Sequence, residues 1–121
     1  MLASLTAQVV LTLTGVETPT GDIYIQLCRE ETFLKEGCAH QAVLPPQEGV
    51  VHTFDSVAPG RWAATAWHDA DGDGVMKTGL FEIPAEPVAI SNDPRALFGP
   101  PDFAAAAIDI GGAPVSITLR F

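Results

Sequence analysis

The stretch "HDADGDG" carries the densest group of potential metal ligands in the chain. Asp69, Asp71 and Asp73 alternate with small residues, and Gly74 follows them. Calcium takes about six to eight oxygen ligands, and the first, third and fifth positions of a calcium loop are often Asp, with a Gly at the sixth for the sharp turn. The carbonyl of Val75 falls at the seventh position, which also ligates calcium. The spacing therefore predicts a calcium-binding loop.

The match to an EF-hand ends after this opening. Lys77 stands at the ninth position, and Leu80 stands at the twelfth, where an EF-hand needs a bidentate Glu. A calcium shell would therefore need oxygen ligands from other segments. Glu82 is the first candidate, and the others are Asn92, Asp93 and Asp102. The alternative is a solvated Asp-Gly turn held by Asx hydrogen bonds, and the sequence leaves both interpretations open.

Catalytic arrangements have less support. His40, His52 and His68 do not have the spacing of metal ligands. His68 adjoins Asp69, but neighbouring residues in a strand point to opposite faces. The sequence has no Ser in a G-x-S-x-G elbow and no glycine-rich phosphate loop. We therefore expect a protein that is not an enzyme, and a hydrolase that uses the loop carboxylates and His68 is the less favoured alternative.

The two cysteines, Cys28 and Cys38, lie ten residues apart between expected strands. A disulfide between them would suit an exported protein and would stabilise the fold by roughly 3 kcal/mol on the loop-entropy model. The alternative is two free thiols, one of them buried. The spacing matches neither a zinc site nor a redox C-x-x-C motif.

The composition limits the partners. The chain has 121 residues and a net charge of −9, from 15 acidic residues against 6 Lys and Arg. This charge opposes binding to nucleic acid or anionic lipid and favours cations or basic partners. No apolar run is long enough for a transmembrane segment. Residues 1–6 are too short for a signal peptide, so the leader of an exported protein is expected outside this sequence.

Short alternating segments separated by turns indicate strands throughout the chain. A long irregular segment is expected over residues 69–104, and loops of this length are usually functional or tightly packed. The pattern predicts one all-β domain over residues 1–121, an antiparallel β-sandwich of about seven to eight strands, immunoglobulin-like or transthyretin-like. Strands are expected over residues 5–14, 22–28, 39–44, 50–54, 61–68, 104–110 and 115–121, with a short apolar run over 88–90.

Several segments in fixed order resemble one bacterial family, domain of unknown function number 2141. They are "LTGVETPTGDIYIQLC", "FDSVAPGRWAATAWHDADGDG", "EIPAEPVAISND" and "LFGPPDFAAAAIDIGG". The resemblance covers nearly the whole chain and implies export from a Gram-negative cell, with no established activity. "VAPGRWAATAWHD" is also loosely similar to transthyretin-like and carboxypeptidase-regulatory-like sandwiches. Relatives typically have Asn at Asp71 and Asp73 and an acid near Lys77, so this chain departs from the family in the loop itself.

A second candidate site lies in "SNDPRALFGPPDF". Its side chains would form a ligand pocket beside the acidic loop, and the alternative is that its aromatic and proline residues only cap the open end of the sandwich. The candidate ligand-binding residues are His68, Ser91, Asn92, Arg95 and Phe98, and the capping residues would be Phe98, Pro100, Pro101 and Phe103.

Together these patterns predict a small periplasmic or secreted binding module without catalytic activity. Its partners would be calcium and an unidentified protein or small-molecule ligand. The alternative is a structural or assembly module of the cell envelope in which the loop binds no metal.

Overall fold

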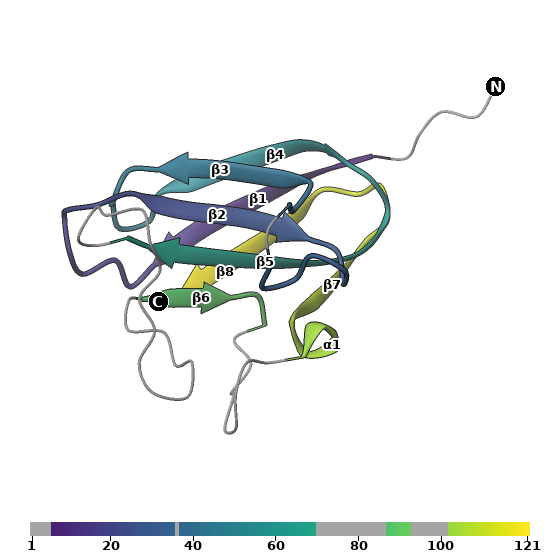
Figure 1. Cartoon of the computed structure of the whole chain (residues 1–121). Coiled ribbons are helices and arrows are strands. Elements are labelled where there is room, and N and C mark those ends of the chain that lie inside the picture. The colour runs from purple at the N-terminus through teal and green to yellow at the C-terminus, as the bar shows by residue number, and fades with distance from the viewer. Residues whose placement is uncertain (1–5, 36, 70–86, 93–101) are drawn as a thin grey trace.

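Two β-sheets packed face to face form the fold, as a computed structural model shows (Figure 1). The structure describes residues 6–35, 37–69, 87–92 and 102–121. The elements in these ranges are β1 (Ala7–Thr14), β2 (Ile23–Cys28), β3 (His40–Leu44), β4 (Val51–Val57), β5 (Gly60–His68), β6 (Val88–Ile90), α1 (Phe103–Ala106), β7 (Ala107–Ile110) and β8 (Val115–Arg120). The all-β sandwich predicted from the sequence is confirmed.

The first sheet has the strand order β4-β1-β8, and the second has the order β3-β2-β5-β6, with β7 also paired to β5. All pairs are antiparallel except β1 with β8, which run parallel. The expectation of a wholly antiparallel sandwich was therefore wrong at this one pair. The turn after β7 does not close a hairpin, because it carries the chain from the second sheet to the first.

The main core lies between the two sheets and follows the predicted alternation. In β1, Val9, Leu11 and Leu13 are fully buried, whereas Gln8 points to solvent. Each large apolar side chain buried in this way stabilises the fold by about 1.5–3 kcal/mol. In the same sheet, β8 adds Ile117 and Leu119. The second sheet supplies the facing layer, which includes Ile23, Ile25, Leu27, Trp62, Ala64 and Ala66.

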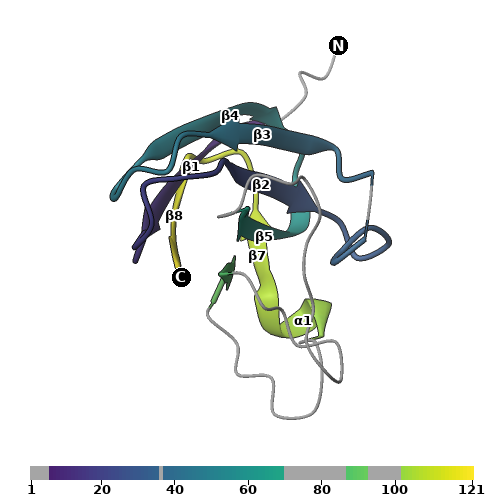
Figure 2. The same ribbon diagram turned by 60° about the vertical axis from the view of Figure 1, so that its left-hand side comes forward.

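A second, smaller core lies on the outer face of the second sheet. Ala63 belongs to this core, while its neighbours Trp62 and Ala64 face the main core, so the middle of β5 is buried on both faces. Phe33 and Phe103 meet edge to face there, with ring centroids 5.7 Å apart. The remaining members are Cys28, Cys38 and Ala106. Figure 2 shows α1 beside β7, away from the first sheet.

Cys28 and Cys38 form a disulfide, with an S–S distance of 2.02 Å and Cα atoms 4.8 Å apart. The bond closes the loop between β2 and β3 against the second core. Of the two alternatives that the sequence left open, the structure therefore has the bonded pair.

The predicted strand over residues 104–110 was wrong for its first three residues, which lie in α1. Alanine has the highest helix propensity and a low strand propensity, so the run Ala104–Ala107 does not favour extended backbone. Packing of Phe103 and Ala106 into the second core then selects one helical turn before β7 begins. Within the described residues, no helix has the length and apolar character needed to cross a membrane.

Candidate functional site

His68 ends β5 and is almost completely buried. Its Nε2 lies 2.9 Å from the carbonyl oxygen of Thr20. Because a carbonyl only accepts, Nε2 must carry the proton and donate it. The ring also lies 6.1 Å from that of Phe121, between centroids. His68 therefore ties the β1–β2 connection to the end of β5, and this ring nitrogen is engaged in a structural contact.

Asp69 follows directly and is only 2% exposed. Its backbone N–H donates to the carbonyl of Asp22 at 2.9 Å, which holds the start of the acidic loop against the second sheet. His68 and Asp69 are both buried, although neighbours in a strand normally point to opposite faces. A buried carboxylate needs a hydrogen-bonding, cationic or metal partner.

Most of the other residues predicted to bind calcium lie outside the part of the chain that the structure describes. Asp71, Asp73, Val75 and Glu82 lie outside the described residues, as does Asp93. Among the described residues, no group of three or more His, Cys, Asp or Glu side chains could hold a metal ion. Asp102 is exposed directly before α1.

Ser91 is fully buried, and both of its bonding groups contact β5. Its N–H donates to the carbonyl of Ala64 at 2.8 Å, and its Oγ accepts from the N–H of Ala64 at 3.0 Å. The same hydroxyl donates to the carbonyl of Ala106 at 2.5 Å. Ser91 was predicted as a ligand-binding residue, but in this structure its hydroxyl joins β5 to the end of α1.

The position of Ser91 follows from the sheet. Along one side of β5, β7 pairs with residues 60–63 and β6 pairs with residues 65–67. Ala64 falls at the junction between the two strands, where neither of them continues the ladder. Ser91 fills this junction with one main-chain and one side-chain bond, so the peptide groups of a fully buried residue stay paired.

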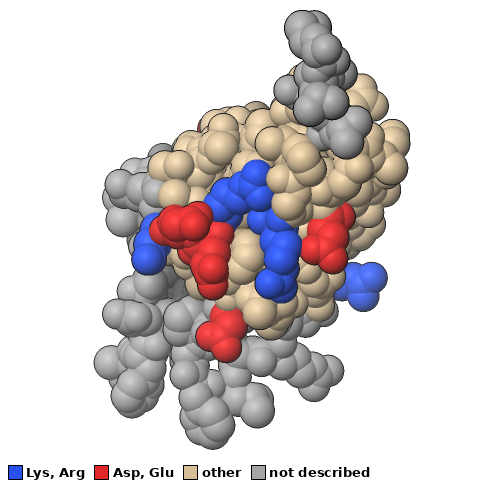
Figure 3. Space-filling model, turned by 90° about the vertical axis from the view of Figure 1, so that its right-hand side faces the viewer, with Lys and Arg blue, Asp and Glu red and all other residues tan. Residues whose placement is uncertain are grey.

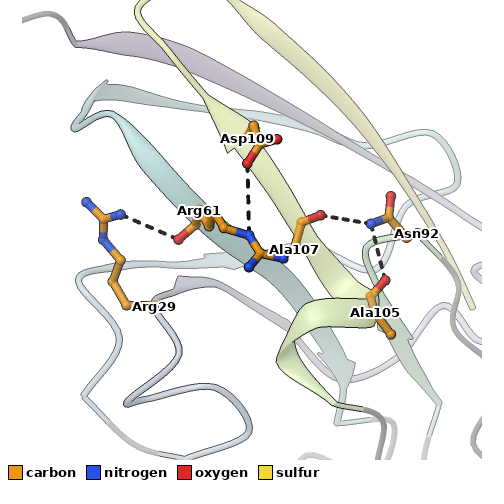
Figure 4. Close-up of polar contacts among 6 residues, drawn as sticks. All are labelled: Arg29, Arg61, Asn92, Ala105, Ala107 and Asp109. Atoms are coloured by element: carbon orange, nitrogen blue, oxygen red, sulfur yellow. Dashed lines mark hydrogen bonds and ion pairs between the residues drawn. The ribbon is translucent and has the colours of Figure 1, made fainter.

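Asn92 continues this connection on the surface (Figure 4). Its Nδ2 donates to the carbonyls of Ala105 and Ala107, at 3.3 Å and 3.0 Å. Its backbone has φ 64°, in the left-handed region that Asn tolerates better than most residues. Asn92 also borders an open groove of about 340 Å³ along β8, together with Ser116, Ile117, Thr118 and Arg120. Arg95 and Phe98, the remaining predicted ligand-binding residues, lie outside the described residues.

A second groove, of about 300 Å³, lies on the outer face of the second sheet. Tyr24 and Trp67 form its aromatic part, with rings stacked at 5.0 Å between centroids and 23° between planes. The rest of the lining comes from β2 and β3: Ile25, Gln26, Gln41, Ala42 and Val43. Sequence reasoning missed this groove, although alternation in β2 already placed Tyr24 and Gln26 opposite the core residues. The pairing with Trp67 and Val43 comes only from the register of three strands.

A basic cluster, formed by Arg29 and His40 at the ring of Trp62, lies near the start of β5. The Arg29 guanidinium stands 3.9 Å above the Trp62 ring and donates to the carbonyl of Pro59. It also donates to the carbonyl of Arg61 (Figure 4). Burial lowers the pKa of His40 below its ordinary value of 6.5, and the charge of Arg29 lowers that pKa further. Figure 3 shows basic side chains with acidic groups on both sides of them, so this face does not present one sign of charge.

The comparisons with known proteins give one match. Neither a curated protein nor a solved structure matches the chain. A family model described as "Uncharacterized protein conserved in bacteria (DUF2141)" matches residues 11–118, a range that runs from β1 to β8 and includes both sheets. The match agrees with the resemblance seen in the sequence motifs. The chain therefore belongs to the DUF2141 family of bacterial proteins.

Proposed function

We propose that this protein is a small exported binding module without catalytic activity, and that the loop following β5 binds calcium. The observation that carries the metal proposal is the burial of Asp69 at the start of this loop. Its N–H donates to the carbonyl of Asp22, so the main chain that carries the first carboxylate of the Asp-x-Asp-x-Asp segment is held in place. A carboxylate held in a buried position is a stronger calcium ligand than one on a mobile turn, because less entropy is lost on binding.

The disulfide supports the exported location. Disulfides persist in the periplasm and outside the cell, whereas cytosolic thiols are kept reduced. Cys28 and Cys38 are both buried in the second core, where their bond holds the β2–β3 loop beside β5. The sandwich therefore combines a bond that suits an oxidising compartment with a net charge of −9 that attracts cations.

Calcium binding is tested by thermal unfolding with added calcium and with a chelator. A ligand that binds only the folded state at a hundredfold excess over its dissociation constant stabilises it by about 2.7 kcal/mol. We expect calcium to raise the Tm of the wild type and of Asp109→Asn, a control whose carboxylate side chain is exposed. We expect Asp69→Asn to remove the rise, and Asp71→Asn tests the same site if the buried variant does not fold.

An unchanged Tm of the wild type on adding calcium contradicts the metal proposal. A rise that persists in both Asp69→Asn and Asp71→Asn contradicts it as well, because calcium would then bind elsewhere. Magnesium serves as a second control, since it demands tighter octahedral geometry and more bound water than calcium does.

The second candidate function is assembly in the cell envelope. The observation that favours it is the exposure of Val43 on β3 and Val51 on β4, which are both edge strands of their sheets. Exposed apolar edges pair readily with other chains. Sedimentation equilibrium tests this candidate: a multimer that Val43→Lys or Val51→Lys dissociates would support it, and a monomer at all concentrations would contradict it.

A further inference from the structure

The outer face of the second sheet is divided into two halves. At one end, α1 and the disulfide-bonded loop cover Cys28 and Ala63. At the other end, β3, β2 and β5 lie side by side (Figure 1). These strands carry the groove formed by Tyr24, Trp67 and their neighbours. The groove therefore lies on a three-stranded surface whose opposite face contacts the main core.

The aromatic row runs across the strands. Val43, Tyr24 and Trp67 are directly paired in the register of β3, β2 and β5, so their side chains form one line on the outer face. Val43 is 57% exposed, and both aromatic residues are half-buried. Tyr24 stacks on Trp67, and both rings line the groove. The row thus presents an apolar, aromatic surface to a ligand.

The next row, two residues along the strands, is polar. Gln41 and Gln26 are paired there and lie about 7 Å from the aromatic row, because each residue of a strand advances the chain by about 3.4 Å. The Gln41 Nε2 donates to the carbonyl of Cys38 at 2.9 Å, which fixes that side chain. The Gln26 amide makes no hydrogen bond to any residue that the structure describes. Each amide has both donor and acceptor atoms.

Among the residues that the structure describes, those that line the groove include no charged side chain. In a protein with a net charge of −9, these described residues offer no cation to an anionic ligand and no carboxylate to a cationic one. The ligand that fits is neutral, has an apolar face for the Tyr24 ring, and has hydroxyl groups that both donate to and accept from the two glutamine amides. A sugar ring combines these properties, because its C–H groups form an apolar face and its hydroxyls surround its edge.

We propose that this groove binds a neutral oligosaccharide, with one sugar ring on Tyr24 and its hydroxyls bonded to Gln26 and Gln41. The proposal names the ligand class of the proposed binding module and rests on that function, but it does not depend on calcium. An extended peptide fits less well. Peptides that add to a sheet bond to the main chain of its edge, whereas this groove presents side chains on the face of β2, an interior strand.

Isothermal titration calorimetry of the whole chain with cellohexaose, maltohexaose and chitohexaose tests this proposal. We expect saturable binding of at least one of them. We expect about two- to tenfold weaker binding in Tyr24→Ala and in Gln26→Ala, because an aromatic contact or a hydrogen bond contributes about 0.5–1.5 kcal/mol. The matched control is Thr53→Ala, which truncates an exposed side chain of β4 in the other sheet, and it should bind as the wild type does.

Absence of binding to all three neutral oligosaccharides would overturn the proposal. Equal affinity of wild type, Tyr24→Ala and Gln26→Ala would also overturn it, as would binding of the anionic polygalacturonate in preference to the neutral chains. Thermal unfolding confirms that each variant is folded, and the glutamine change is made at a half-buried surface position. Titrations with calcium and with a chelator separate the two sites, because a failed calcium site leaves saccharide binding unchanged.

Discussion

Replacement of Ser91 by alanine tests whether this residue holds the second sheet together. The hydroxyl accepts from the N–H of Ala64 and donates to the carbonyl of Ala106, and all three residues are fully buried. Ser91→Ala removes one oxygen and keeps the methylene, so its main effect is to leave two buried backbone groups without these bonds. Each such group destabilises the folded state by about 1–3 kcal/mol.

The two losses together predict a decrease of about 2–6 kcal/mol in the free energy of unfolding. Since small domains are stable by about 5–15 kcal/mol, this is a large share of the total. Guanidinium denaturation with the disulfide intact measures the change from the midpoint and slope. The control is Ser116→Ala on the exposed face of β8, which should change stability by less than about 0.5 kcal/mol.

A decrease below about 1 kcal/mol in Ser91→Ala would refute this reasoning. It would mean that Ala64 and Ala106 find other partners when the hydroxyl is lost. A decrease within the expected range instead establishes Ser91 as a structural residue at the junction of β6 and β7.

Two further predictions concern the basic cluster. Gly60 has φ 130°, and an added Cβ would overlap the Arg29 guanidinium. We therefore expect Gly60→Ala to lower the free energy of unfolding by about 1–3 kcal/mol. The control is Gly111→Ala, which should have little effect because the space around the new Cβ is open. Burial and Arg29 depress the pKa of His40, so the stability that neutral His40 contributes is fully present above pH 6.5 and is lost as the pH falls below it. Urea denaturation across this acid range should therefore show a smaller loss in His40→Gln than in the wild type, with His52→Gln as the control. Parallel pH profiles of wild type and His40→Gln would contradict the second prediction.

The strands of this fold were predictable because their residues alternate. In β1 and β8 the apolar residues recur at every second position, and this period leaves only one face for the core. The helical turn of α1 was not predictable in the same way. Its alanines have no alternation, and the packing of Phe103 against Phe33, far away in the sequence, decides their conformation.

The residues of the candidate site also differ in how far the sequence could predict them. Local spacing was enough to single out the acidic loop, because calcium ligands within one loop follow one another in the chain. Spacing was not enough for Ser91, whose partners Ala64 and Ala106 lie 27 and 15 residues away. From the sequence alone, a serine beside an asparagine is expected to be exposed. The sheet instead buries Ser91 at the junction between β6 and β7.

By itself, the sequence determined the all-β class, the strand positions and the residues of the acidic loop, because each depends on periodicity or spacing within one segment. Only the tertiary structure decided which strands are neighbours, that β1 and β8 run parallel, and that Tyr24 meets Trp67 on the outer face. Strand register is set by the burial of whole faces against each other, and that burial exists only once both sheets have formed.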